Sequence, residues 1–210
     1  MHNNIKSILS SSPVMPVLVI NKINNVENLI ASLIEGNLNN IEVTLRTSCA
    51  LKAIEIIANK FPELKVGAGT ILNTTDLKNV KDAGASFAVS PGSTYELAKM
   101  AVDINFPFLP GVSSSSEIMN LLNLGYKCFK FFPAEAAGGI KYLNSLKGPF
   151  PDIMFCPTGG INENNALEWL SQKNVICVGG SWIVPSNIYD YKEITNKALL
   201  ASKLINKWIT

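Results

Sequence analysis

A strand-like segment, residues 41–46 with the sequence IEVTLR, carries an acid, a hydroxyl and the only arginine of the 210-residue chain. Side chains of a β-strand alternate between its two faces, so Glu42, Thr44 and Arg46 share one face and three apolar residues share the other. If the apolar face packs against helices, the polar face points inward, where an unpaired charge is costly. Two interpretations stay open. A Glu42–Arg46 ion pair would only close the end of a barrel, whereas a free Arg46 guanidinium would bind a carboxylate with its planar fork.

A second segment, CFKFF at residues 128–132, places a lysine among aromatic residues. Cys128, Lys130 and Phe132 share one face of the expected strand, and Phe129 and Phe131 take the other. Burying a lysine is costly, and a fold tolerates that cost most readily where the amine does chemistry, such as imine formation with a carbonyl substrate. The alternative is a lysine that reaches solvent or pairs with an acid such as Glu135.

Two glycine pairs follow apolar segments late in the chain. CPTGG ends at Gly160, after Thr158 and Gly159, and VGGSW contains Gly180 followed by Ser181. In a barrel, backbone N–H groups after the seventh and eighth strands commonly bind phosphate. Ser181 adds a hydroxyl and is expected to begin a short helix whose N-terminus faces the anion.

Thr70 in GAGT and Pro91 in SPG would lie at the same end of the strands, where each alone reads as a turn residue.

Composition excludes several classes of function. The only histidine is His2, so a His-based metal site and a catalytic relay through imidazole are excluded. A net charge of +2 gives no basic surface for nucleic acid. The four cysteines are far apart in the sequence, which indicates buried thiols in a reducing compartment. With Pro13 and Pro16 interrupting the first apolar stretch, we expect neither a signal peptide nor a membrane span, and a cytoplasmic location.

Short apolar runs recur about every 20 to 26 residues, the spacing of strand–helix units in a parallel sheet. The expected strands start at residues 16, 41, 65, 86, 106, 127, 152 and 174. Intervening helices are predicted at 26–35, 49–60 and 75–83, with a short helix over 3–11 before the first strand and a final helix over 189–208. The serines at 113–116 before Glu117 predict a capping box at a helix start.

Eight near-equal repeats predict a single closed (β/α)8 barrel over residues 1–210, with no linker. An open doubly wound sheet has the same pattern, but no G-x-G-x-x-G turn follows the first strand. In a barrel the ligand site lies at the C-terminal ends of the strands.

The segments EVTLRT, VGAGT, SPG, LPGVSS, FKFFPAE, CPTGG and GGSW occur in this order over residues 13–185. Together they make the chain resemble the family of 2-keto-3-deoxy-6-phosphogluconate (KDPG) aldolases, also called 4-hydroxy-2-oxoglutarate (KHG) aldolases. The resemblance implies a class I aldolase of the Entner–Doudoroff pathway. It also implies a homotrimer of barrels that needs no metal. We expect no other cofactor, and the charge and hydropathy described above lead us to expect neither a nucleic-acid nor a membrane partner.

Roles for individual residues also come from this resemblance. It makes Lys130 the Schiff-base lysine, Glu42 the general acid and base, and Arg46 the group that binds the pyruvate carboxylate. The remaining expected substrate-binding residues are Thr70, Pro91, Phe132, Thr158, Gly159, Gly160, Gly180 and Ser181, the last four around the phosphate of a phosphorylated 2-keto acid.

The predicted reaction is cleavage of KDPG to pyruvate and glyceraldehyde 3-phosphate, and of KHG to pyruvate and glyoxylate. One alternative is a phosphate-binding barrel that isomerises or epimerises a sugar phosphate, with Glu42 as base and Lys130 as its electrostatic partner. Another is a non-catalytic sensor of a phosphorylated ligand.

Overall fold

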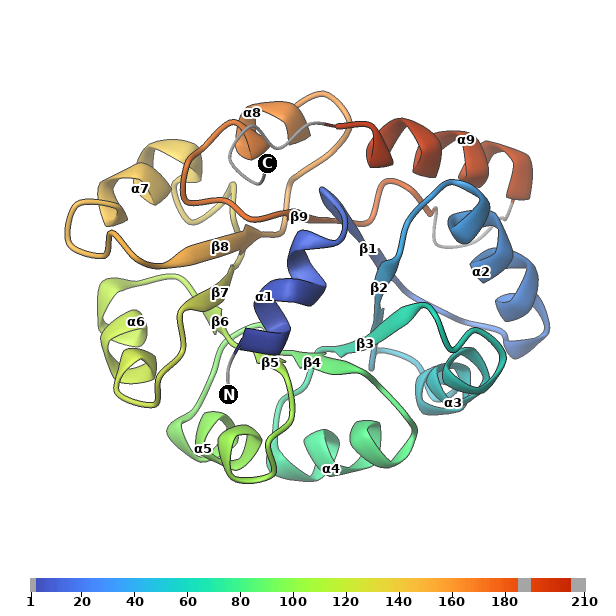
Figure 1. Cartoon of the computed structure of the whole chain (residues 1–210), viewed down its shortest axis with the longest axis horizontal. Coiled ribbons are helices and arrows are strands. Elements are labelled where there is room, and N and C mark those ends of the chain that lie inside the picture. The colour runs from blue at the N-terminus through green and yellow to red at the C-terminus, as the bar shows by residue number, and fades with distance from the viewer. Residues whose placement is uncertain (1–2, 185–189, 205–210) are drawn as a thin grey trace.

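The computed structural model describes residues 3–184 and 190–204, in which helices surround a central set of parallel strands (Figure 1). The strands are β1 Val14–Leu18, β2 Asn40–Thr44, β3 Lys65–Gly69, β4 Phe87–Val89, β5 Phe108–Leu109, β6 Gly111–Val112, β7 Cys128–Phe131, β8 Met154–Pro157 and β9 Val178–Gly180. The helices are α1 Asn3–Ser10, the 3-10 turn Ile23–Asn25, α2 Val26–Glu35, α3 Ala50–Lys60, α4 Thr74–Asp82, α5 Tyr95–Asp103, α6 Ser115–Leu122, α7 Gly139–Leu146, α8 Ala166–Leu170 and α9 Tyr191–Ser202.

The predicted closed (β/α)8 barrel is wrong, because the strands form two separate parallel sheets. One sheet has six strands in the order β5-β4-β3-β2-β1-β9, and the other has three in the order β6-β7-β8. The first break lies at Pro110, the last residue of the expected strand FPFLP, which starts at residue 106. Leu109 pairs with Val89 in the larger sheet, whereas Gly111 pairs with Lys130 in the smaller one. Proline has no N–H to donate, so the ladder is interrupted there.

The second break lies between β8 and β9. Two isolated bridges, Phe155 with Val175 and Thr158 with Gly179, are recorded between these segments in the described part of the chain. Strand β8 ends at Pro157, and β9 begins only at Val178, later than the expected start at residue 174. The barrel is therefore incomplete in its hydrogen bonding at two places.

Most predicted helices are confirmed within one or two residues. Helix α2 covers the predicted residues 26–35, and α3 and α4 begin one residue from their expected starts. Ser114 begins α6 with the predicted capping box, in which its hydroxyl and the Glu117 side chain each accept from the other's backbone N–H. Of the predicted final helix, α9 covers 191–202, while residues 189 and 205–208 lie outside the described residues.

Two apolar clusters form the core. The larger packs the outward face of the sheets against the helices, with residues such as Ile41, Val43 and Phe129. The smaller lies inside the ring of strands and includes Met15 and Cys177, together with residues of α1. Because Asn40, at the start of β2, donates to the α1 backbone, the predicted N-terminal helix covers the N-terminal ends of the strands. The opposite ends remain for a ligand.

Candidate active site

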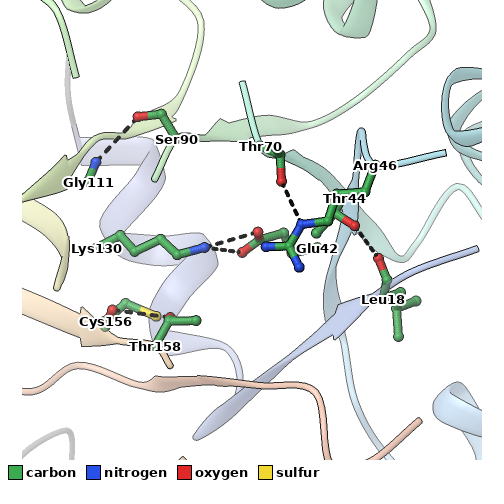
Figure 2. Close-up of polar contacts among 10 residues, drawn as sticks. All are labelled: Leu18, Glu42, Thr44, Arg46, Thr70, Ser90, Gly111, Lys130, Cys156 and Thr158. Atoms are coloured by element: carbon green, nitrogen blue, oxygen red, sulfur yellow. Dashed lines mark hydrogen bonds and ion pairs between the residues drawn. The ribbon is translucent and has the colours of Figure 1, made fainter. Parts of the chain in front are cut away.

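Lys130 and Glu42 form a buried ion pair inside the ring of strands (Figure 2). Lys130 Nζ lies 3.1 Å from Glu42 Oε1 and 3.3 Å from Oε2. Only 6% of the lysine side chain and 1% of the glutamate side chain are exposed. Two charges this far from solvent stabilise a fold poorly compared with apolar residues, so their presence indicates a chemical role.

The alternation of strand faces predicted from the sequence directs both Lys130 and Glu42 into the ring of strands. Phe129 and Phe131, on either side of Lys130 in β7, belong to the outer apolar cluster. Ile41 and Val43 do the same for Glu42 in β2. Glu42 takes Lys130 as its partner, so the alternative of a Glu42–Arg46 pair that only closes the barrel does not account for Glu42.

The alternative partner for the lysine, Glu135, points elsewhere. Its carboxylate accepts hydrogen bonds from Trp169 Nε1 and Asn165 Nδ2. The buried pair therefore joins β7 to β2, which are 88 residues apart in the sequence.

Gly69, the last residue of β3, leaves the space that the Glu42 carboxylate occupies. A Cβ on Gly69 would fall onto Glu42 Oε1 and would lie 2.6 Å from its Cδ and 2.7 Å from its Cγ. The sequence alone does not reveal this role, because it depends on which residues of neighbouring strands lie side by side. In the structure Gly69 pairs with Thr44, and Thr44 is on the same strand face as Glu42.

Arg46 and Thr70 meet where β2 and β3 end. Arg46 Nε donates to Thr70 Oγ1 at 3.4 Å, and the arginine is exposed. Thr70 has a φ of 63°, in the left-handed region that a β-branched residue rarely adopts. Such strain costs about 1–3 kcal/mol and is concentrated at functional sites. Because the guanidinium is exposed, it can bind an anion, with the Thr70 hydroxyl beside it.

Phe132 and Pro91 lie at the same end of the strands. The Phe132 ring centroid is 5.5 Å from Lys130 Nζ, which places an aromatic face near the amine. Pro91 follows β4 and is half-buried, next to Ser90, whose buried hydroxyl accepts from the backbone N–H of Gly111 at 3.3 Å. Ser90 thus ties β4 to β6 across the break at Pro110, a contact that sequence reasoning did not anticipate.

The two predicted glycine pairs lie at the ends of β8 and β9. Gly159 and Gly160 have φ values of 100° and 81°, conformations that favour glycine. Thr158 packs against Gly179, because a Cβ on Gly179 would overlap the Thr158 hydroxyl. Gly180 ends β9 under the Trp182 ring, and Ser181 follows it with an exposed side chain. The expected helix is not formed at residues 181–184, which are bends, and 185–189 lie outside the described residues.

The described residues contain neither a metal-binding cluster nor a membrane-spanning helix. In residues 3–184 and 190–204, no group of three or more His, Cys, Asp or Glu side chains is arranged to hold a metal ion. Nor does any helix in these ranges combine the length and hydropathy that crossing a membrane requires.

The site thus joins a buried amine, a carboxylate within proton-transfer distance, a guanidinium, and two glycine pairs, of which Gly160 is exposed while Gly179 and Gly180 are buried. An amine beside a carboxylate can form an imine with a ketone, because the carboxylate can take up and return protons. The guanidinium and the glycine turns suit a substrate with a negative group at each end.

Comparison with known proteins identifies the family. The sequence model of the KDPG and KHG aldolase family matches residues 5–197. Over 196 residues the chain is 47% identical to a KHG/KDPG aldolase of Escherichia coli K12, with 92% of each chain covered. It is also 47% identical over 193 residues to a 2-dehydro-3-deoxy-phosphogluconate aldolase of Dickeya dadantii, which covers 90% of this chain and 91% of the relative.

Solved structures agree with this result. The KDPG aldolase of Zymomonas mobilis ZM4, solved with 3-phosphoglycerate, superposes with a TM-score of 0.97 at 43% identity over the full length of both chains. The KDPG aldolase of Legionella pneumophila, with pyruvate captured as a covalent carbinolamine, gives a TM-score of 0.93 at 44% identity and covers 95% of this chain and 98% of that one. The chain therefore belongs to the KDPG and KHG aldolase family and is an aldolase, a lyase that cleaves a carbon–carbon bond.

Proposed function

We propose that this aldolase cleaves KDPG to pyruvate and glyceraldehyde 3-phosphate through a Schiff base on Lys130. The observation that carries the proposal is the buried contact between Lys130 and Glu42. The names of relatives at 47% identity and the carbinolamine captured in the Legionella enzyme support it. Cleavage of KHG to pyruvate and glyoxylate is proposed from the combined name of the Escherichia coli relative.

The reaction begins when Glu42 accepts a proton from the Lys130 ammonium, which leaves a neutral amine to attack the C2 ketone. Glu42 then gives the proton to the carbinolamine hydroxyl, which leaves as water, and a protonated imine remains. This imine draws electrons from the C3–C4 bond while Glu42 removes the C4 hydroxyl proton. The aldehyde leaves, and the enamine of pyruvate is bound to Lys130.

Glu42 then protonates C3 of the enamine, and water hydrolyses the resulting protonated imine, which releases pyruvate and regenerates the Lys130 ammonium and the Glu42 carboxylate. Every proton that the carboxylate removes is later returned, so one carboxylate is sufficient for both directions. The short distances between Lys130 Nζ and both Glu42 oxygens support this assignment.

The ends of the substrate are held by different elements. Arg46, with Thr70 beside it, binds the carboxylate next to the ketone, because the guanidinium is exposed at the end of β2. Pro91 and Phe132 contact the carbon chain, and Thr158 offers its hydroxyl to the middle of the substrate. The phosphate binds at Gly159, Gly160, Gly180 and Ser181, an assignment supported by the position of these residues at the ends of β8 and β9.

Three further properties are part of the proposal. The enzyme serves the Entner–Doudoroff pathway in the cytoplasm, which the four free thiols support. It assembles as a homotrimer, and large apolar side chains that stay exposed in the single chain, such as Leu72 and Met119, support subunit contacts. Light scattering during size-exclusion chromatography tests the mass.

The function is tested by incubating the protein with KDPG and quantifying the products. We expect pyruvate and glyceraldehyde 3-phosphate in equal amounts, and we expect Lys130→Ala to release neither. Conversion of KDPG or another sugar phosphate to an isomer without pyruvate release would instead favour an isomerase. Glu42→Gln is expected to cleave KDPG about 100 to 10,000 times more slowly than the wild type.

A further inference from the structure

Glu135 lies between the lysine strand and the proposed phosphate site. It follows β7 by four residues, and its backbone and side chain both contact the loop after β8. We propose that Glu135 is a positioning residue that holds the Gly159–Gly160 turn in the shape that binds phosphate, and thereby favours phosphorylated substrates. This inference rests on the proposed function.

The Glu135 carboxylate is held by two donors. Trp169 Nε1 donates to Oε1 at 2.8 Å, and Asn165 Nδ2 donates to the same oxygen at 3.2 Å. Trp169 is fully buried and packs with Phe131, with 6.3 Å between ring centroids. Because Phe131 is the neighbour of Lys130, the donor that fixes Glu135 belongs to the rigid core behind the active site.

The same group of residues fixes the glycine turn. Asn165 Nδ2 also donates to the Gly160 carbonyl oxygen at 3.1 Å, and the backbone N–H of Glu135 donates to the Gly159 carbonyl oxygen at 3.1 Å. A Cβ on Gly160 would lie 2.7 Å from Glu135 Cβ, so the turn packs directly on this residue. Both carbonyl oxygens of the turn therefore accept hydrogen bonds from Glu135 or from Asn165, which itself donates to Glu135.

One N–H group of the turn remains for a ligand. Within residues 3–184 and 190–204, the backbone N–H of Gly160 has no acceptor, whereas the bridge between Thr158 and Gly179 directs the Gly159 N–H to the Gly179 carbonyl oxygen. An anion site needs such groups to be fixed before the ligand arrives, because ordering a flexible glycine turn would reduce affinity. Glu135 supplies this order through an acceptor oxygen, and its own charge does not contact the turn's N–H groups.

Two substitutions of Glu135 should differ in their effect. Glutamine in place of Glu135 keeps an oxygen that can accept from Trp169 and Asn165, whereas alanine removes it. We therefore expect Glu135→Ala to raise the KM for KDPG about tenfold, with kcat changed less than about twofold. Glu135→Gln is expected to restore the KM to within about threefold of the wild type, since acceptor geometry and not charge is needed.

The experiment measures KM and kcat for KDPG and for KHG, which has no phosphate, and the inhibition constant of inorganic phosphate. In Glu135→Ala, the KM for KDPG and the inhibition constant of phosphate should rise together, while the KM for KHG stays near the wild-type value. Trp169→Phe, which keeps a ring but removes the donor, should raise the same two constants. Glu163→Ala, an exposed acid on the loop after the turn, is the matched control and should change neither.

Several results would overturn the proposal. One is an unchanged KM for KDPG in Glu135→Ala, and another is an equal loss with both substrates, which indicates general damage to the fold. If Glu135→Gln raised the KM for KDPG as much as Glu135→Ala does, the hydrogen-bond acceptor at residue 135 would not be what holds the turn. If the wild type cleaves no KDPG at all, the proposed function fails first, so the two failures are distinguishable.

Discussion

Replacing Gly69 with alanine should damage catalysis through Glu42 while leaving the reactive lysine in place. The new Cβ would overlap Glu42 Oε1 and approach Cδ to 2.6 Å, closer than real Cβ contacts. The β3 backbone cannot easily move away from Glu42, because Gly69 ends a strand that is paired with β2 over five residues. The carboxylate must therefore move, and its 3.1 Å contact with Lys130 Nζ must lengthen.

The size of the effect follows from these distances. Restoring an ordinary contact of 3.4 Å requires a shift of the carboxylate by roughly 1 Å, and misplacement by ~1 Å can reduce the rate about 100-fold. We therefore expect kcat for KDPG to fall about 100-fold, at the low end of what a general acid and base contributes. Overpacking should also lower the free energy of unfolding by about 1–3 kcal/mol.

The assay compares steady-state kcat and urea unfolding for the wild type, Gly69→Ala, Glu42→Gln and the double variant. If Gly69 acts through Glu42, adding Gly69→Ala to Glu42→Gln should reduce kcat much less than it does in the wild type. Gly148→Ala is the control, because its new Cβ would meet nothing within 4 Å. A Gly69→Ala protein with wild-type kcat, or losses that multiply in the double variant, would refute the reasoning.

Three other properties can be measured on the same protein. Both Thr70→Gly and Thr70→Ala remove the hydroxyl beside Arg46. Because Thr70 is in the left-handed region, the free energy of unfolding measured in urea should be about 1 kcal/mol higher for Thr70→Gly than for Thr70→Ala. Burial alone would raise the pKa of Glu117, but hydrogen bonds from the serines before α6 outweigh it and lower the pKa below its usual value. The stabilising effect of the Glu117 carboxylate is then complete above the unfolded-state pKa and is lost as the pH falls through the lower folded-state pKa. Between about pH 6 and about pH 3, the free energy of unfolding should therefore fall less in Glu117→Gln than in the wild type. Burial raises the pKa of the Cys128 thiol to about 11. A thiol reagent near pH 8 should therefore modify the half-buried Cys49 first. The buried thiols, Cys128, Cys156 and Cys177, should react only when the protein is denatured.

The inward direction of Glu42 and Lys130 could be predicted from sequence because a strand alternates with a period of two. That rule is local and needs no knowledge of which strands are neighbours. Their pairing could not be predicted in the same way, since 88 residues separate them and nearer charges were available to each. In the sequence, Arg46 was the nearby candidate partner of Glu42, and Glu135 was the nearby candidate partner of Lys130. In the structure Arg46 donates to Thr70, and Glu135 accepts from Trp169 and Asn165.

Barrel closure depended on details that a count of repeats does not contain. Eight apolar runs predict eight strand positions, but continuity of the ladder needs an N–H at each step. Pro110 ends the expected fifth strand, and directly after it comes a strand that was not predicted, β6, which pairs in a different sheet from β5. The role of Gly69 was hidden for a related reason: the space it leaves is defined by a side chain on the neighbouring strand, and strand register is not visible in one sequence.

The central claim, that Lys130 is the nucleophile, is tested most directly by trapping the imine. The protein is incubated with pyruvate, reduced with borohydride, digested and analysed by mass spectrometry. We expect loss of activity and a reduced pyruvate adduct on Lys130. The adduct should be absent in Lys130→Ala and retained in part in Glu42→Gln. An adduct on any other lysine, or full activity after reduction with no adduct, would contradict it.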